Sequence, residues 1–157
     1  MNVGSWLLWG FVGTVVLTMA MVVSQELRLT RVNLPYVLGT MFSPDRSRAK
    51  VFGTLVHLAN GFAFSLLYVA AFEAWGVASW WRGAAIGLVH ATFVLTVGMP
   101  LLPGIHPRMA TEHAGPSMRR QLEPPGFLAL HYGRRTPLSI LIAHLLFGAV
   151  LGTFYRV

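Results

Sequence analysis

Four long apolar runs constrain what this chain can fold into. They cover residues 4–24, 51–75, 81–102 and 137–155. Each is close to the roughly 20 residues that a helix needs to cross the hydrocarbon core of a bilayer. None alternates apolar and polar residues as a barrel strand would, and only helices and closed barrels satisfy their backbone hydrogen bonds in lipid. The sequence therefore predicts an all-α membrane protein with four transmembrane helices in an antiparallel bundle.

The composition agrees with a single transmembrane domain over residues 1–157. Only 11% of the residues are charged, whereas a soluble domain carries about 25%. The chain has no cysteine, which excludes disulfides and thiolate metal sites. The net charge of +7 could indicate nucleic-acid binding. Basic residues that flank membrane spans have another cause, however, so we expect the lipid bilayer as a partner and no nucleic acid.

The basic residues are concentrated in the two long connections, 25–50 and 103–136. Each connection holds five of the 12 Lys and Arg residues, so that the two together hold ten. Two spans separate the connections, which places them on the same side of the membrane. The positive-inside rule predicts that this side is the cytoplasm. We therefore expect a multi-pass protein of the bacterial cytoplasmic (inner) membrane with both termini on the periplasmic side.

The first connection contains the signals of a short helix. Asn33 is suited to cap it, and Pro35 falls in its first turn. Apolar residues then recur at helical spacing at Leu34, Val37, Leu38, Met41 and Phe42. This pattern predicts a short amphipathic helix in the membrane interface. Ser43, followed by Pro44, is predicted to cap the helix of the second span.

The second connection is rich in proline. Seven of the nine prolines lie within 100–137, which prevents a long helix there. The apolar segment 126–130 is expected to fold back toward the membrane. Arg134 and Arg135, just before the fourth span, are expected to pair with anionic lipid headgroups. Near the predicted outer end of the second span, Glu73 is expected to reach the interface or to pair with Arg82.

Three of the spans carry one histidine each: His57, His90 and His144. Ionisable residues inside a membrane usually face the interior of the bundle. At 1.5 Å per helical residue, each lies roughly 9–18 Å from the cytoplasmic end of its span. The glycine pairs Gly83–Gly87 and Gly148–Gly152 share faces with two of the histidines and allow close helix packing. We therefore predict that three imidazoles face one layer in the cytoplasmic half.

Several kinds of chemistry suit that layer. Three imidazoles suit a transition metal, with Met19 or Met21 as an added ligand. Alternatively, His57 and His144 hold the iron of haem b, or the histidines form a proton relay or a polar substrate site. They could also only hydrogen-bond between helices. The neighbours expected to orient or bond them are Asn60, Thr14, Thr18 and Tyr68.

The second connection adds four further candidates, namely His106, Glu112, His113 and His131. Their spacing fits no standard zinc site. They are either solvated or interfacial side chains, or the connection folds over the mouth of the bundle and lends one ligand. Ser65 and Ser139 have no plausible base and acid around them, and no phosphate loop or dinucleotide fingerprint occurs. We therefore expect no independent enzymatic activity.

Short motifs in all four spans carry a resemblance. They are GTVVLTMAM, HLANGFAFSLLY, RGAAIGLVH and AHLLFGAVLGTFY. In these motifs the chain resembles an uncharacterised family of small four-helix bacterial integral membrane proteins, which implies a fold and no activity. Besides cofactor binding, the sequence leaves a second hypothesis open. The protein would then be a non-catalytic accessory or assembly subunit of a larger respiratory or photosynthetic type membrane complex, with other subunits or itself as partner.

Overall fold

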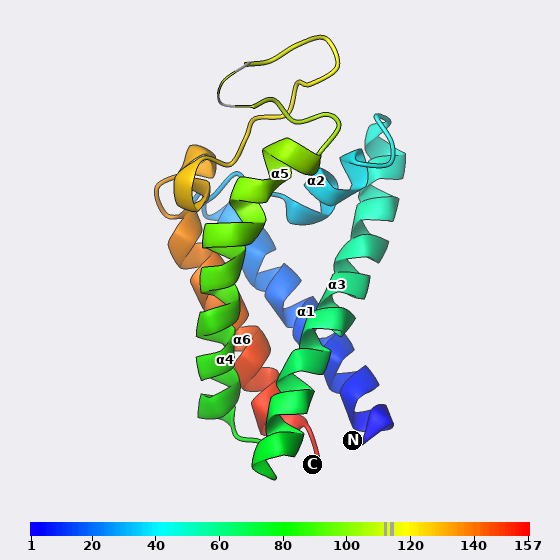
Figure 1. The fold of residues 1–157 in the computed structure, drawn as a ribbon, viewed down its shortest axis with the longest axis vertical. Helices are drawn as coiled ribbons and strands as arrows, with labels where there is room; N and C mark the ends of the chain where they lie inside the picture. Colours follow the sequence, from blue (N-terminus) through cyan, green and yellow to red (C-terminus); the bar gives the residue numbers. More distant parts are fainter. Residues whose placement is uncertain (112, 114) are drawn as a thin grey trace.

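A computed structural model describes residues 1–111, 113 and 115–157 (Figure 1). Glu112, one of the candidates above, therefore lies outside the described residues. The elements are α1 (Val3–Glu26), α2 (Leu34–Thr40), α3 (Arg46–Trp75), α4 (Trp80–Phe93), η1 (Val94–Gly98), α5 (Met99–Ile105), η2 (Phe127–Tyr132) and α6 (Thr136–Phe154). Within the described part of the chain, extended pairing is limited to two isolated bridges, Met109–Leu122 and Thr111–Gly115.

Four helices are long and apolar enough to cross a membrane. They are Val3–Glu26, Arg46–Trp75, Trp80–Ile105 and Thr136–Phe154. This finding confirms the predicted multi-pass, all-α membrane protein. The helix predicted after Asn33 is also present as α2, and the Asn33 side chain accepts a hydrogen bond from the amide of Tyr36 at 3.0 Å.

The start of α3 differs from the prediction. The capping residue is Asp45, whose side chain accepts the amide of Arg48 at 2.8 Å. Ser43 instead accepts the amide of Asp45 at 3.2 Å and forms the turn before the helix. The carboxylate therefore takes the capping role that the sequence assigned to the hydroxyl. At its other end α3 stops at Gly76, whose φ of 64° is the left-handed conformation that glycine favours.

The third span is longer than predicted and is not uniform. It extends beyond residue 102 to Ile105, with Pro103 inside α5. A π-helical segment, η1, interrupts it immediately before Met99. Pro100 has no amide to donate to the carbonyl four residues back, and a wider π turn accommodates such a missing bond. The helix therefore continues through two prolines that the sequence suggested would stop it.

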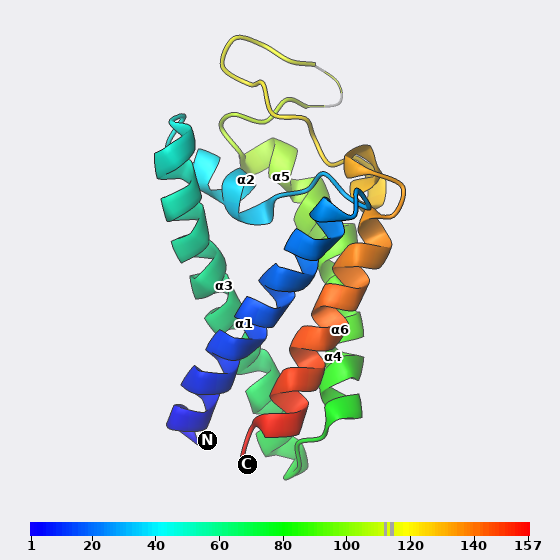
Figure 2. The same ribbon diagram turned by 180° about the vertical axis from the view of Figure 1, so that it is seen from behind.

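The long helices lie side by side, and the two ends of the molecule differ (Figure 1). Figure 2 shows both chain termini and the α3–α4 turn at one end, here called the terminal end. The other end, here called the loop end, carries α2, α5, η2 and the described residues of the connection between α5 and η2, namely 106–111, 113 and 115–126. Neither name implies a side of the membrane.

Glycines bring α4 and α6 into close contact along their length. A Cβ added to Gly83 would overlap the carbonyl of Gly148, and a Cβ added to Gly148 would overlap the carbonyl of Gly83. Gly87 and Gly152 are equally close to the backbone of the opposite helix or its preceding turn. The packed faces predicted from the two GxxxG pairs are therefore present.

The helix α3 joins the others mainly toward the terminal end. There a buried cluster connects α3 with α1 and α6, and its members include Leu17, Tyr68, Val69, Phe72, Phe147 and Leu151. Toward the loop end α3 leans away from α4 and α6 (Figure 1). The space is partly filled by α2, because Gly39 packs on the carbonyl of Ala49 and Gly53 packs on the carbonyl of Pro35.

The segment 126–130 folds back on the long helices. Within η2, Ala129 is fully buried and Tyr132 is 7% exposed. Both belong to a second buried cluster that includes Leu95, Met99 and Ile140. The segment therefore packs on the helices at the loop end, which agrees with the expected return of this apolar stretch.

Candidate functional site

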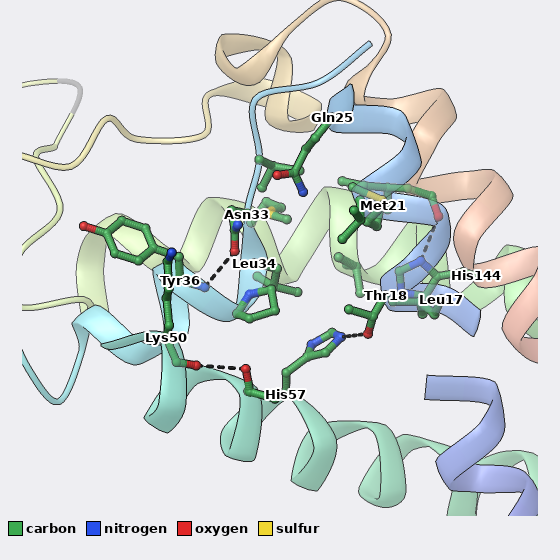
Figure 3. A pocket seen from close by; sticks show the side chains of 17 residues that line it. Leu17, Thr18, Met21, Gln25, Asn33, Leu34, Tyr36, Lys50, His57 and His144 are labelled. Carbon is green, nitrogen blue, oxygen red and sulfur yellow. Dashed lines mark hydrogen bonds between the residues drawn. The ribbon is translucent and has the colours of Figure 1, made fainter. Parts of the chain in front are cut away.

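A cavity in two adjoining lobes lies between the long helices in the half near the loop end. Figure 3 shows the first of these lobes. The lobes have volumes of about 240 and 190 Å³. The residues that line both of them are Leu17, Leu34, His57, Val94, Met99 and His144. We call the two lobes together the chamber. Its walls are mainly apolar. Two of the three predicted histidines, His57 and His144, line both lobes, and the third, His90, lines only the second lobe.

The chamber exists because α3 leans away from its neighbours. The first lobe lies between α1 and α3, and its lining includes Met21 of α1 and Thr54 of α3. The second lobe lies between α3 and α4, where Phe64 stacks on His90 with ring centres 4.2 Å apart. Neither lobe is sealed. Leu34 and Leu38 of α2 contribute to the walls from the loop end, so that α2 forms the roof of the chamber.

His57 is fixed by a bond to α1. Its side chain is buried at 9% exposure, and Nε2 lies 3.1 Å from the Thr18 hydroxyl oxygen. That hydroxyl donates its own hydrogen to the carbonyl of Thr14 at 2.7 Å. In Figure 3 Thr18 lies between His57 and His144, with the His57 bond drawn as a dashed line. Thr18 is one of the neighbours that the sequence offered as a partner for a histidine, and here it bonds to His57.

His90 and His144 contact each other directly. Their rings meet edge to face with centres 4.6 Å apart. Nδ1 of His144 lies 2.8 Å from the carbonyl oxygen of Ile140, and Nδ1 of His90 lies 3.1 Å from the Tyr68 hydroxyl. Tyr68 was one of the neighbours expected to bond a histidine, and here it bonds to His90. The three histidines border one chamber, as the sequence predicted, but each is already bonded to a different partner.

The remaining intramembrane candidates are divided. Met21 lines the first lobe and Asn60 the second. Thr14 also lines the second lobe and donates to the carbonyl of Gly10. Met19, the other methionine candidate, lines neither lobe. It is 54% exposed, because one residue of helical rotation turns it away from the face that carries Thr18. Among the described residues, no group of three His, Cys, Asp or Glu side chains is placed to hold one metal ion.

Of the loop candidates that the structure describes, only His106 is deeply buried, with 1% of its surface exposed. Its Nε2 lies 2.9 Å from the Val37 carbonyl and 3.2 Å from the Thr40 hydroxyl, while Nδ1 accepts the amide of Arg108 at 3.1 Å. The Arg108 guanidinium donates to the carbonyl of Thr40. His106 therefore attaches the loop to α2 and does not reach the chamber.

Burial lowers the pKa of His106 below its usual value of 6.5, and the positive charge of Arg108 lowers it further. The Val37 carbonyl acts in the opposite direction, because it favours a protonated ring nitrogen. His106 is therefore held as a neutral imidazole. Its protonation would place a second hydrogen on Nδ1, where the Arg108 amide now donates.

The other candidates lie at the surface. His113 is exposed, and so is His131, whose Nδ1 is 3.0 Å from the carbonyl of Pro124. Arg134 and Arg135 are exposed at the start of α6, and their pairing with lipid headgroups stays a prediction.

Glu73 was expected to reach the interface or to pair with Arg82. In the structure it bonds to a different partner. Its carboxylate accepts the hydroxyl of Tyr155. The guanidinium of Arg82 instead lies over the rings of Trp75 and Trp81, 5.7 and 5.1 Å from their centres. The return of the C-terminal segment beside α3 brings Tyr155 to Glu73, which the local sequence does not reveal.

Sequence reasoning also missed the roof of the chamber. The pattern of apolar residues located α2, but it did not show that Leu34 and Leu38 line a cavity. The glycines Gly39 and Gly53 could have indicated that α2 packs on α3, since glycines in facing helices permit close contact. No protein-family model, no curated protein and no solved structure matches the chain significantly.

Proposed function

We propose that the protein binds a lipophilic small molecule in the chamber and exchanges it with the surrounding bilayer. The observation that carries this proposal is an unsealed, mainly apolar cavity that lies between helices long and apolar enough to span a membrane. Sites for small molecules are typically concave and mostly apolar, with a few polar groups that set orientation. Here the imidazoles of His57, His90 and His144 supply the polar groups.

The surroundings of the chamber favour a ligand from the membrane over one from water. Both lobes border α3 and lie between helices whose other faces expose large apolar side chains such as Leu55 and Val89. Toward the loop end, in contrast, α2 lines the chamber and is attached to the loop through His106. We therefore expect an apolar ligand to enter the chamber from the lipid, between these helices.

A transition metal or haem b is the second candidate occupant. One observation favours it, because His144 is bonded through Nδ1 to a backbone carbonyl, as metal-binding histidines commonly are. Purified protein should be examined by elemental analysis and by absorption spectroscopy. A stoichiometric metal or a Soret band that His144→Ala removes would support this candidate. Protein without either would reject it. The accessory-subunit hypothesis is tested by whether a larger complex co-purifies at fixed stoichiometry.

The lipophile proposal is tested by photolabelling in liposomes. The probe is a long-chain alcohol that carries a diazirine in its chain, and the competitor is the same alcohol without the diazirine. We expect labelling that saturates with probe and is removed by excess competitor. Labelling that rises linearly with probe and ignores the competitor would overturn the proposal.

Two matched variants locate the labelling. Leu34→Trp places a bulky ring in the roof, where Leu34 lines both lobes. Leu67→Trp makes the same change on α3 at a side chain that is 62% exposed and lines neither lobe. We expect the first variant to lose most of the saturable labelling and the second to keep it. Equal labelling of the two variants would contradict a site in the chamber.

A further inference from the structure

We infer that the ligand presents a hydroxyl group, as an alcohol, phenol or quinol does, to the unprotonated ring nitrogens of His57 and His144. This inference rests on the proposed function and names the chemical class of its ligand. It follows from the direction of the hydrogen bonds that already hold the two rings. A neutral imidazole has one donor nitrogen and one acceptor nitrogen, so that fixing one role fixes the other.

The Thr18 hydroxyl determines the roles in His57. A threonine hydroxyl has one hydrogen, and that of Thr18 is donated to the carbonyl of Thr14 at 2.7 Å. Toward His57, the Thr18 oxygen can therefore only accept. Nε2 of His57 must carry the hydrogen, and Nδ1 is left with a lone pair. No partner for that nitrogen occurs among the described residues.

A backbone carbonyl determines the roles in His144. The Ile140 oxygen 2.8 Å from Nδ1 can only accept, so Nδ1 carries the hydrogen. Nε2 is then the acceptor, and it too has no partner in the described part of the chain. Both rings remain neutral in this setting, because a charged imidazolium in an apolar cavity without a carboxylate would be costly.

The two rings therefore present acceptors to a chamber whose other walls are mainly apolar. An acceptor without a partner in an apolar cavity is unfavourable, and a ligand that donates a hydrogen bond relieves this cost. A hydroxyl is a neutral donor and can enter an apolar chamber with its chain. An ether, a ketone or a quinone has acceptors only, and places a lone pair against a lone pair. The chamber should therefore discriminate against these heads at equal chain length.

Thr18 acts in this account as a positioning residue. It touches His57 and holds its tautomer, and the hydroxyl of the ligand then meets Nδ1. In Thr18→Val the His57 ring is free to carry its hydrogen on either nitrogen. We expect this near-isosteric variant to lose much of the preference for a hydroxyl head, so that an alcohol competes no more strongly than its methyl ether.

The experiment uses the full chain in liposomes and the saturable photolabelling described above. The competitors share one chain length and are a primary alcohol, its methyl ether, an alkyl hydroquinone and the corresponding quinone. Each lost hydrogen bond should weaken competition about 3- to 10-fold. We expect the alcohol and the hydroquinone to compete more strongly than the ether and the quinone. If the hydroquinone competes more strongly than the alcohol, a quinol is the favoured source of the hydroxyl. If the alcohol competes more strongly, the source is a lipid alcohol.

The outcomes separate the two claims. If the ether and the quinone compete as well as the hydroxyl compounds, this inference is wrong, although the chamber still binds lipophiles. If no labelling saturates, the proposed function itself fails. Nitrogen-15 spectra of histidine-labelled protein provide a readout that needs no ligand. They should show Nδ1 of His57 and Nε2 of His144 unprotonated in the wild type, and a changed His57 signal in Thr18→Val.

Discussion

The two halves of the molecule hold their helices together in different ways. Toward the terminal end, glycines bring α4 and α6 into backbone contact, and aromatic and aliphatic side chains fill the space beside α3. Toward the loop end, α3 leans away, and a seven-residue helix, α2, covers the space that results. The three histidines line the chamber in this second half, and each is held there by a hydrogen bond.

This difference separates stability from binding. A membrane protein has little hydrophobic drive to bring its helices together, so close packing must supply much of the association. The glycine contacts between α4 and α6 provide it toward the terminal end. The helix α3 can then stand apart near the loop end and leave a chamber. We expect changes in the tightly packed half to affect folding most, and changes near the chamber to affect opening and binding.

The largest effect is expected for Gly148→Ala. The added Cβ would overlap the carbonyl of Gly83, and a backbone atom cannot move aside as a side chain can. Overpacking of this kind costs on the order of 3 kcal/mol of unfolding free energy. Unfolding in mixed detergent micelles measures it. The control is Gly104→Ala in α5, where an added Cβ meets nothing within 4 Å. Equal stability of the two variants would contradict the account of helix packing.

The next effect concerns the roof of the chamber. In Gly53→Ala the new Cβ would overlap the carbonyl of Pro35, so that α2 must move off α3. Hydrogen exchange should become faster by at least about 10-fold at the amides of α2, and much less at those of α4 and α6. Unchanged exchange in α2 would show that the glycine contact does not hold the roof.

A smaller and reversible effect is expected from pH. His106 has its usual pKa when the loop is detached from α2, and a lowered pKa when it is attached. The attachment is therefore fully stable above the usual value of 6.5 and weakens as the pH falls below it, by at most about tenfold for each pH unit. Exchange in α2, corrected for its intrinsic pH dependence, should rise between pH 7.5 and pH 5.5. His106→Gln should remove this rise, and a rise that persists in the variant would assign it to another group.

The smallest effect is expected for Tyr132→Phe, outside the spans. The hydroxyl of Tyr132 donates to the carbonyl of Glu123 at 2.8 Å, and burial raises its pKa to about 12. Loss of this bond should cost about 1 kcal/mol of unfolding free energy. An ultraviolet titration should also lose the phenol that ionises near pH 12. The control is Tyr36→Phe, and a Tyr132 variant as stable as this control would show that the bond contributes nothing.

Local patterns predicted the elements of this fold well. The length and composition of the apolar runs identified the four long helices, and Asn33 with Pro35 identified α2. The helical period placed His57 and Thr18 on facing surfaces, where they do bond. The same period could not show whether Met19, one residue beyond Thr18, lies inside or outside the bundle. The packing of α1 decides which of two adjacent faces turns outward.

The chamber could not be predicted in this way. It depends on how far α3 leans from α4, and that angle is set by contacts between residues far apart in the chain. Gly39 and Gly53 hold the roof, and Tyr155 returns from the C-terminal segment to Glu73. The free acceptors of His57 and His144 were also hidden, since a tautomer depends on the partner that each ring finds in the folded protein.

The central claim is that the chamber, and not the outer surface of the helices, binds the lipophile. The most direct measurement is to identify by mass spectrometry which residues the diazirine alcohol labels in the wild-type protein. The account predicts adducts that competitor removes, concentrated in residues 17–25 of α1 and 54–64 of α3, which border the two lobes. Adducts spread evenly over the exposed faces, with Leu67 labelled as strongly as these segments and no effect of competitor, would contradict it.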